Sequence, residues 1–133
     1  LAWPHLVANP GGCTSLAAPR HNSRELHQRG RPRRSARALD FDHRGCAWVV
    51  CEDSDEVVRY DAQTGTELAR IRIPAARDGE RARPVDILVE PEAERAWVAC
   101  HGSGSLQIID QRIERCVAEV DGLRQPASLC FAP

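Results

Sequence analysis

The chain has 133 residues and a formal net charge of −1, with 42% hydrophobic and 28% charged residues. It holds no uninterrupted apolar run of 18 residues, so no helix is expected to span a membrane. All 18 basic residues are Arg, and this complete exclusion of Lys indicates the codon usage of a GC-rich genome, such as that of a high-GC bacterium.

Residues 1–37 form a basic segment with seven Arg and one Glu, whereas residues 38–133 hold eleven Arg and eighteen acidic residues. The run 29–37 is typical of an arm that binds nucleic acid or another anionic surface, or of a solvated linker that lies on the acidic remainder. No aromatic residue interrupts this run, so base stacking is unsupported and we expect no nucleic-acid partner.

Residues 38–83 are predicted to form four short strands separated by polar turns. The first strand covers 38–41, the second contains Trp48, the third ends at Asp61 and the fourth covers 67–73. Turn chemistry follows the third strand, because Asp61 can accept hydrogen bonds from nearby amides and Gly65 permits positive φ.

Residues 84–125 repeat this pattern 49 residues later. Ala96-Trp97-Val98-Ala99-Cys100 corresponds to Ala47-Trp48-Val49-Val50-Cys51, and in both copies an Asp follows the Trp after 13 residues without a gap. A repeat of about 40–50 residues that contains four short strands is typical of a β-propeller blade. We therefore predict an all-β protein with about two complete four-stranded antiparallel blades, in which Trp48 and Trp97 are equivalent and pack between blades.

Both ends of the chain are predicted to contribute to a partial third blade. Residues 126–133 resemble the first strand of a further blade, because Pro126 stands where Pro84 starts the second one. Residues 1–37 are either irregular or a degenerate part-blade, because 6–12 can be aligned with 98–104.

The length of the chain predicts a partner for the propeller. At about 45 residues per blade the chain holds at most three blades, whereas closed propellers have roughly four to eight. We expect the ring to be closed by other copies, for example as a six-blade two-fold dimer, by a protein partner, or by a missing part of the chain.

The repeated segments resemble the YVTN/NHL-type β-propeller family. The resemblance is carried by Trp-Val-Val-Cys and Trp-Val-Ala-Cys in the second strands, and by Ser-Asp-Glu-Val-Val-Arg-Tyr-Asp and Gly-Ser-Leu-Gln-Ile-Ile-Asp after them. It covers about residues 37–133 and departs from the family in placing Cys and Trp in the central strand. The resemblance implies the fold and leaves function open, since propellers of this kind include binding modules, hydrolases and electron-transfer enzymes.

Candidate ligand-binding residues lie in the turns that follow the two Trp strands. They are Glu52, Asp53, Asp55 and His101, which we expect to converge on one rim of the propeller near its channel. Such a group could hold a divalent cation, but a turn requires Asp and Ser in any case. We therefore predict a ligand-binding rim without a metal site, a cofactor or a catalytic residue.

The six cysteines offer two interpretations. Cys51 and Cys100 occupy equivalent strand positions in neighbouring blades, too far apart for a disulfide, and are predicted to be small buried hydrophobic groups. Cys46 could pair with a residue on a first or fourth strand, such as Cys116 or Cys130. No C-x-x-C motif is present, so structural zinc and covalent haem are unsupported.

The sequence predicts a non-enzymatic binding or scaffold protein that acts through the propeller face. The alternatives are a metal-assisted hydrolase of the lactonase kind and a propeller subunit of a redox complex. The compartment is unassigned, with a periplasmic or secreted location preferred.

Overall fold

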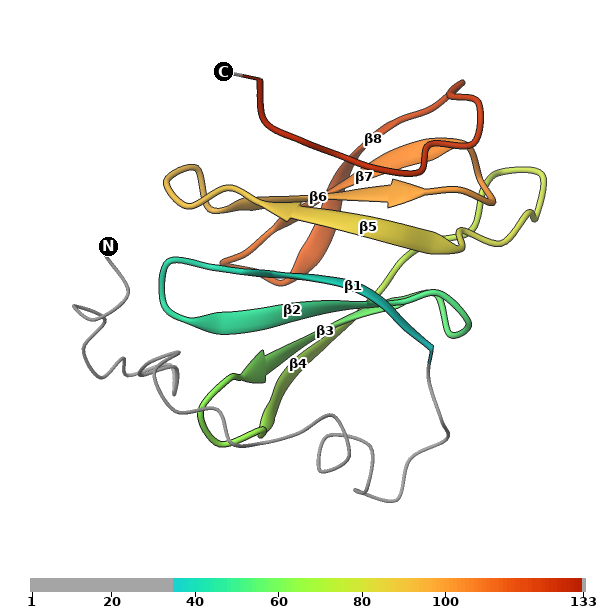
Figure 1. Ribbon diagram of the computed structural model, residues 1–133. Coiled ribbons are helices and arrows are strands. Elements are labelled where there is room, and N and C mark those ends of the chain that lie inside the picture. The colour runs from blue at the N-terminus through green and yellow to red at the C-terminus, as the bar shows by residue number, and fades with distance from the viewer. Residues whose placement is uncertain (1–34, 133) are drawn as a thin grey trace.

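The computed structural model describes residues 35–132 and is all-β in this range, with eight strands in two four-stranded antiparallel sheets (Figure 1). Blade 1 consists of β1 (Ala36–Phe41), β2 (Cys46–Cys51), β3 (Glu56–Asp61) and β4 (Glu67–Arg72). Blade 2 consists of β5 (Pro84–Val89), β6 (Arg95–Cys100), β7 (Ser105–Asp110) and β8 (Arg115–Val120). The eight strands predicted within residues 38–125 are confirmed, whereas residues 126–132, predicted as the first strand of a further blade, form no strand. The basic segment falls outside the described residues up to residue 34.

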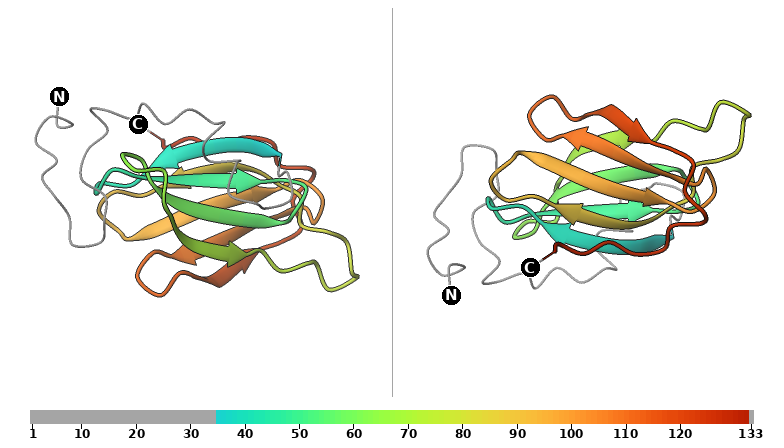
Figure 2. Two further views of the ribbon diagram at one scale, coloured as in Figure 1. Left: turned by 90° about the horizontal axis from the view of Figure 1, so that it is seen from below. Right: turned by 90° about the horizontal axis from the view of Figure 1, so that it is seen from above.

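The two blades stack face to face, with β5 beside β1 and the strands fanning out from this inner edge (Figures 1 and 2). Apolar side chains from both sheets form one shared core, to which Trp48, Val50, Val57, Ile71 and Ile73 contribute from blade 1 and Ile87, Val89, Ala96, Val98, Cys100 and Ile109 from blade 2. The fold prediction is therefore confirmed: these are stacked propeller-type blades, and the two sheets do not close into a ring.

Strand register confirms that the two blades are equivalent. Trp48 lies between Asp40 and Arg59 in blade 1, and Trp97 lies between Leu88 and Ile108 in blade 2. Likewise, Val50 is paired with Val57 and Ala99 with Leu106. The constant 13-residue spacing between Trp and Asp thus places each pair at the same point of its sheet.

Equivalent residues nevertheless face different surroundings. Trp48 and Val50 point into the core between the blades, so their equivalents Trp97 and Ala99 point away from blade 1. Residues paired across neighbouring strands share a face. We define the open face of blade 2 by Trp97, Ala99 and the residues in register with them, which are Asp86 and the apolar residues Leu88, Leu106, Ile108, Ala118 and Val120. Within residues 35–132, no third sheet covers it.

The segment after β8 forms no strand but follows β5, as the red C-terminal segment in Figure 1 shows. The amide of Leu129 donates to Asp86 Oδ2 at 2.7 Å, and in the same way the amide of Val89 in β5 donates to Asp40 Oδ2 of β1 at 2.8 Å. Residues 126–132 therefore lie beside β5 much as β5 lies beside β1.

The structure confirms the prediction for Cys51 and Cys100 and corrects the one for Cys116 and Cys130, which were considered as disulfide partners of Cys46. Cys51 and Cys100 are free and buried, which confirms them as small core groups. Cys116 and Cys130 are also free, so the suggestion that either pairs with Cys46 is wrong. The sulfur of Cys116 packs against the core between the blades, and Cys130 is exposed, so neither pairs with Cys46.

Candidate ligand-binding rim

The turns that follow β2 and β6 lie at the same end of the two blades and contact one shared linker, residues 81–83. From blade 1, Asp55 accepts hydrogen bonds from Arg81 Nε at 3.1 Å and from the amide of Arg83 at 2.8 Å. From blade 2, the amide of His101 donates to the carbonyl of Arg83 at 3.1 Å, and that of Gly102 to Ala82 at 3.0 Å. The turns that hold the four candidate residues therefore meet at one rim.

Arginine side chains already engage the acidic groups of this rim. Glu52 Oε1 accepts a hydrogen bond from Arg83 Nη2 at 3.0 Å, and the other oxygen lies 3.7 Å from Arg37 Nε. Asp53 takes part through its carbonyl oxygen, which accepts from Arg81 Nη2 at 2.7 Å. The hydrogen bond and the charge of Asp55 raise the pKa of the Arg81 guanidinium above its ordinary value. Glu52 and Asp55 thus act first as orienting groups for arginine.

The rim depends on two glycines in the turn after β6. A Cβ at Gly102 would collide with the carbonyl oxygen of Arg81, and one at Gly104 would collide with that of Leu123. Gly104 also adopts a φ of 63°, which costs side-chain-bearing residues energy. Close passage of the linkers on either side therefore explains the Gly102-Ser103-Gly104 sequence.

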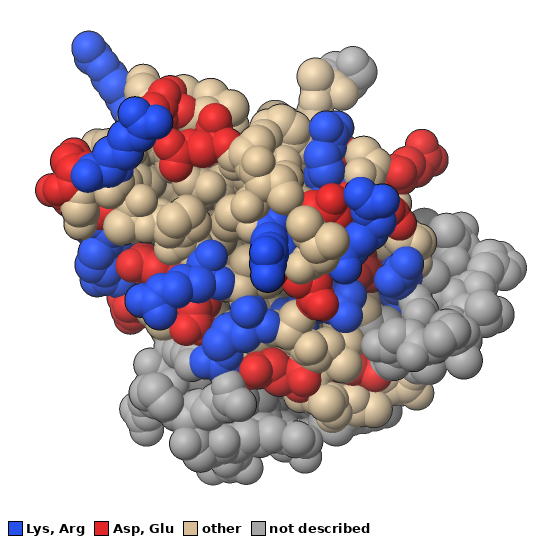
Figure 3. Space-filling view, turned by 180° about the vertical axis from the view of Figure 1, so that it is seen from behind, with Lys and Arg blue, Asp and Glu red and all other residues tan. Residues whose placement is uncertain are grey.

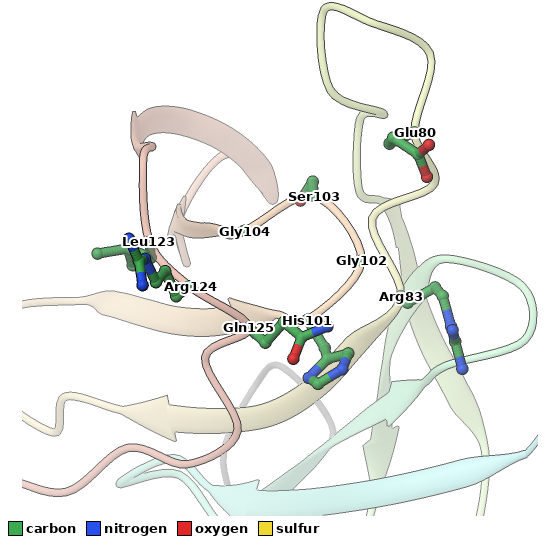
Figure 4. Close-up of a pocket in the computed structure, with 9 residues that line it drawn as sticks. All are labelled: Glu80, Arg83, His101, Gly102, Ser103, Gly104, Leu123, Arg124 and Gln125. Carbon is green, nitrogen blue, oxygen red and sulfur yellow. The ribbon is translucent and has the colours of Figure 1, made fainter.

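An open pocket of about 610 Å³ lies beside this turn. It is lined by turn residues 101–104, by Leu123, Arg124 and Gln125 of the segment after β8, and by Glu80 and Arg83 of the preceding linker (Figure 4). Two arginines and one histidine face one carboxylate, so the lining is locally basic. Arg124 is exposed and forms no ion pair with the described residues.

Away from this pocket, one face of the molecule shows interleaved charges. On the face in Figure 3, Arg side chains lie among Asp and Glu side chains and neither sign dominates. Residues 35–132 contain no group of three or more His, Cys, Asp or Glu side chains placed to hold a metal ion. The same residues include no helix long and apolar enough to cross a membrane.

The remaining motif residues have structural roles. Asp61 and Asp110 cap the turns after β3 and β7, with Oδ1 accepting the amides of Gln63 at 2.9 Å and Arg112 at 2.8 Å. This agrees with the capping role expected of Asp61 and extends it to Asp110. For Asp110, the hydrogen bonds from Arg112 lower the pKa of the carboxyl group below its ordinary value.

Sequence reasoning missed the partners of the two indoles. Trp48 Nε1 donates to Asp42 Oδ2 at 3.0 Å, and Trp97 Nε1 donates to Glu90 Oε1 at 2.6 Å. Asp42 and Glu90 are the first residues after β1 and β5. An acidic residue at the same place in each repeat was the signal that could have revealed these bonds.

Comparisons with known proteins bear on the fold. No protein-family model matches the chain, and no curated protein matches it. Among solved structures it resembles the hydrazine synthase of Kuenenia stuttgartiensis, with 22% identity and a TM-score of 0.60 over 71% of this chain and 26% of that one. It also resembles a streptogramin B lyase (13%, 0.57, over 69% and 28%) and apo AztD of Citrobacter koseri (18%, 0.54, over 76% and 26%).

These neighbours are β-propeller-type proteins, and the chain spans about a quarter of the length of each. At such identities the likeness shows the fold alone. Stacked four-stranded blades in the chain and propellers among its neighbours lead to the same conclusion: residues 35–132 fold as two β-propeller-type blades.

Proposed function

We propose that this chain belongs to a propeller of the YVTN/NHL type and that it binds a protein partner through the rim, without catalysis. The observation that carries the proposal is that the turns after β2 and β6 both form hydrogen bonds with residues 81–83. These hydrogen bonds hold Arg81 and Arg83 where the two turns meet. Arg81 and Arg83 remain more than half exposed at 55% and 52% while their carboxylate partners are largely covered, at 18% and 17%. Oriented and exposed guanidinium groups are well suited to recognise a carboxylate.

The chemistry of the partner follows from the pocket. Arg83, Arg124 and His101 surround it, opposed by Glu80. An acidic peptide segment would meet two cationic side chains there, whereas a basic one would be repelled. Glu52 and Asp55 position Arg81 and Arg83 in this proposal, and His101 is the candidate residue that touches the ligand.

The competing hydrolase requires carboxylates that are available to a cation. In this rim the Glu52 and Asp55 oxygens accept hydrogen bonds from arginine, so a metal would first have to displace a guanidinium group. Titration calorimetry with Ca²⁺ distinguishes the two functions. We expect no binding heat; a heat abolished by Asp55→Asn would support the hydrolase and contradict our proposal.

The binding function is tested with a fluorescein-labelled hexaglutamate peptide and fluorescence anisotropy. Arg124→Ala should weaken binding several-fold, whereas Arg115→Ala, at an arginine that is also exposed and starts β8, should leave it unchanged. Rising salt should weaken binding to the unmodified chain, since the contacts are exposed charges. No binding at low salt, or equal loss in both variants, would contradict the proposal.

A further inference from the structure

The turns after β2 and β6 hold the segments that leave the two blades in the same way. Asp55 with a φ of 53° and Gly104 with a φ of 63° occupy the same place in the two turns. The carbonyl of Asp55 accepts the amide of Ile73 at 2.9 Å. Likewise, the carbonyl of Gly104 accepts the amide of Leu123 at 2.8 Å. Linkers 73–83 and 121–125 therefore both begin against a turn of the same geometry.

The last residues of these two linkers also share a conformation. Arg83 precedes Pro84 with a φ of 48°, and Gln125 precedes Pro126 with a φ of 44°. Positive φ is uncommon for residues other than glycine, and the residue before a proline usually has an extended conformation with negative φ. Arg83 and Gln125 therefore form equivalent bends of the chain, one at the end of each linker.

The amides of these two residues differ in their acceptors. Asp55 Oδ1 accepts the amide of Arg83 at 2.8 Å while Oδ2 accepts Arg81 Nε at 3.1 Å, so one carboxylate joins a backbone amide to a guanidinium group. Within residues 35–132, the amide of Gln125 donates to no acceptor. Gly104 has no side chain to offer, and a Cβ there would collide with the carbonyl oxygen of Leu123. Blade 2 therefore cannot supply the equivalent carboxylate from this position.

The turn after β6 has also lost the other acidic residues of the turn after β2. Three acidic residues are replaced by one histidine and two glycines, in the pairs Glu52 and His101, Asp53 and Gly102, and Asp55 and Gly104. A cationic side chain is nevertheless present, because exposed Arg124 lines the pocket beside this turn. Glu80 is the acidic residue of the lining, and it comes from the other linker. Blade 1 thus neutralises its arginines with its own turn, whereas the turn of blade 2 offers Arg124 no carboxylate.

We propose that a carboxylate of the bound partner does at blade 2 what Asp55 does at blade 1. One of its oxygens accepts the amide of Gln125 and the other an N–H of the Arg124 guanidinium group, in the pocket of about 610 Å³ (Figure 4). A carboxylate suits this pair because it accepts from two donors at once and forms charge-assisted hydrogen bonds. The inference rests on the proposed function and names the group of the acidic partner that enters the pocket.

Amide NMR spectra of the isotope-labelled full chain, recorded during a titration with sodium acetate, test this site. The amide proton of Gln125 should shift downfield and saturate, because a hydrogen bond to a charged oxygen deshields it. The amide of Arg83 already donates to Asp55 and should stay in place. Sodium chloride at the same concentration is the control and should move neither signal. A Gln125 signal that ignores acetate, or that responds equally to chloride, would overturn the proposal.

Two variants test whether the carboxylate has the same contacts in both blades. Asp55→Gly should keep the turn, because glycine tolerates positive φ, and it removes the acceptor of the Arg83 amide. Acetate should then shift the Arg83 signal as it shifts that of Gln125. Arg124→Ala should weaken the response of Gln125 several-fold, whereas Arg115→Ala should leave it unchanged. An unresponsive Arg83 amide in Asp55→Gly, or an unaltered Gln125 response in Arg124→Ala, would contradict the proposal.

Two peptides distinguish the source of the carboxylate. Acetyl-Gly-Gly-Asp-Gly-Gly-amide carries it on a side chain, and acetyl-Gly-Gly-Gly-Gly-Gly carries it at the C-terminus. The peptide that shifts the Gln125 amide at the lower concentration identifies the source, and no shift with either would overturn the proposal. Failure here is distinct from failure of the proposed function. Hexaglutamate that binds in the anisotropy experiment without shifting the Gln125 amide would support the acidic partner and refute the carboxylate site.

Discussion

Blade 1 and blade 2 have the same strands and register, but only blade 1 has its Trp face covered by a neighbour. Ile71 and Ile73 at the outer edge of blade 1 are 3% and 2% exposed, whereas their equivalents Val120 and Leu123 are 43% and 37% exposed. Ile73 and Leu123 are matched because their amides donate to the equivalent carbonyls of Asp55 and Gly104. The same side-chain pattern thus becomes core or surface according to whether another sheet follows.

The turns of the two blades differ in a second way. Three left-handed positions recur 49 residues apart, and at each one blade has Gly where the other has an acidic residue: Gly45 and Glu94, Asp55 and Gly104, Gly65 and Glu114. A non-glycine residue in this conformation costs about 1–2 kcal/mol. The two blades therefore share a positive φ at these three turn positions although their residue types differ. The strained non-glycine residue is Asp55 in blade 1, and Glu94 and Glu114 in blade 2.

The largest expected effect separates the two tryptophans. Trp48 is 0% exposed in the core between the blades, and Trp48→Ala should lower the free energy of unfolding by about 3–5 kcal/mol. Trp97 is half-buried, so Trp97→Ala should cost roughly half as much. Urea denaturation followed by circular dichroism measures both. Equal losses would mean that the open face is covered in solution to the same degree as the core.

The next effect concerns a glycine that two constraints require. Gly104→Ala should destabilise by about 2–4 kcal/mol, because positive φ and a clash with the Leu123 carbonyl both oppose a side chain. Gly79 is the matched control, with a φ of 87° and no atom within 4 Å of an added Cβ. Gly79→Ala should cost only about 1–2 kcal/mol in the same denaturation experiment. If both variants lose the same amount, the contact with Leu123 is not maintained in solution.

How far the sequence predicts the fold depends on which interactions repeat. Strands and register were predictable because Trp48 and Trp97 recur with fixed spacing to Asp61 and Asp110. The hydrogen bonds from Val89 to Asp40 and from Leu129 to Asp86, which join each first strand to the next inner segment, could not be predicted. Asp40 lies opposite Trp48, whereas Asp86 lies opposite Ala99. Each aspartate accepts a backbone amide of the next inner segment, but the two lie at different positions of their strands. An alignment of the repeats therefore does not match Asp40 with Asp86.

The rim was predictable in its location and not in its chemistry. Equivalent turns of stacked blades must meet at one end, which brings Glu52 and His101 to the same side of the molecule. Arg81 and Arg83, which donate hydrogen bonds to the carboxylates, come from linker 73–83, which has eleven residues where 121–125 has five. A segment without a counterpart in the other repeat gives no pattern from which its contacts could be inferred.

A smaller effect concerns the equivalent thiols of the two blades. Burial raises the pKa of Cys51 to about 11 and that of Cys100 to about 12, from an ordinary value of 9.0. Because the unfolded thiols ionise first, stability is complete below about pH 9 and falls as pH rises towards the folded values. The slope is at most about 1.4 kcal/mol per pH unit for each thiol.

Denaturation midpoints between about pH 8 and pH 10.5 measure this slope, and Cys100→Ala should reduce it. Burial also raises the pKa of Cys116 to about 11, so this thiol contributes to the same slope, and the difference between the unmodified chain and Cys100→Ala isolates the part that belongs to Cys100. An unchanged slope in Cys100→Ala would mean that another group causes the alkaline loss of stability.

The smallest effect tests whether the acidic residues at left-handed positions are strained. Glu94 has a φ of 53°, where its equivalent in blade 1 is Gly45. Glu94→Gly should relieve about 1–2 kcal/mol of strain and lose about 0.5–1 kcal/mol to the greater freedom of unfolded glycine. The ion pair with Arg112, 3.4 Å long and largely exposed, contributes little. A net gain of about 0–1.5 kcal/mol is therefore expected. Glu92→Gly, at an exposed turn position with ordinary φ, is the control and should be neutral or slightly destabilising. Because the backbone amide of Gln111 donates to the Glu94 carbonyl in either case, the difference between the two variants isolates backbone strain from loss of the turn. A loss of stability in Glu94→Gly as large as in Glu92→Gly would show that blade 2 carries no strain at this turn.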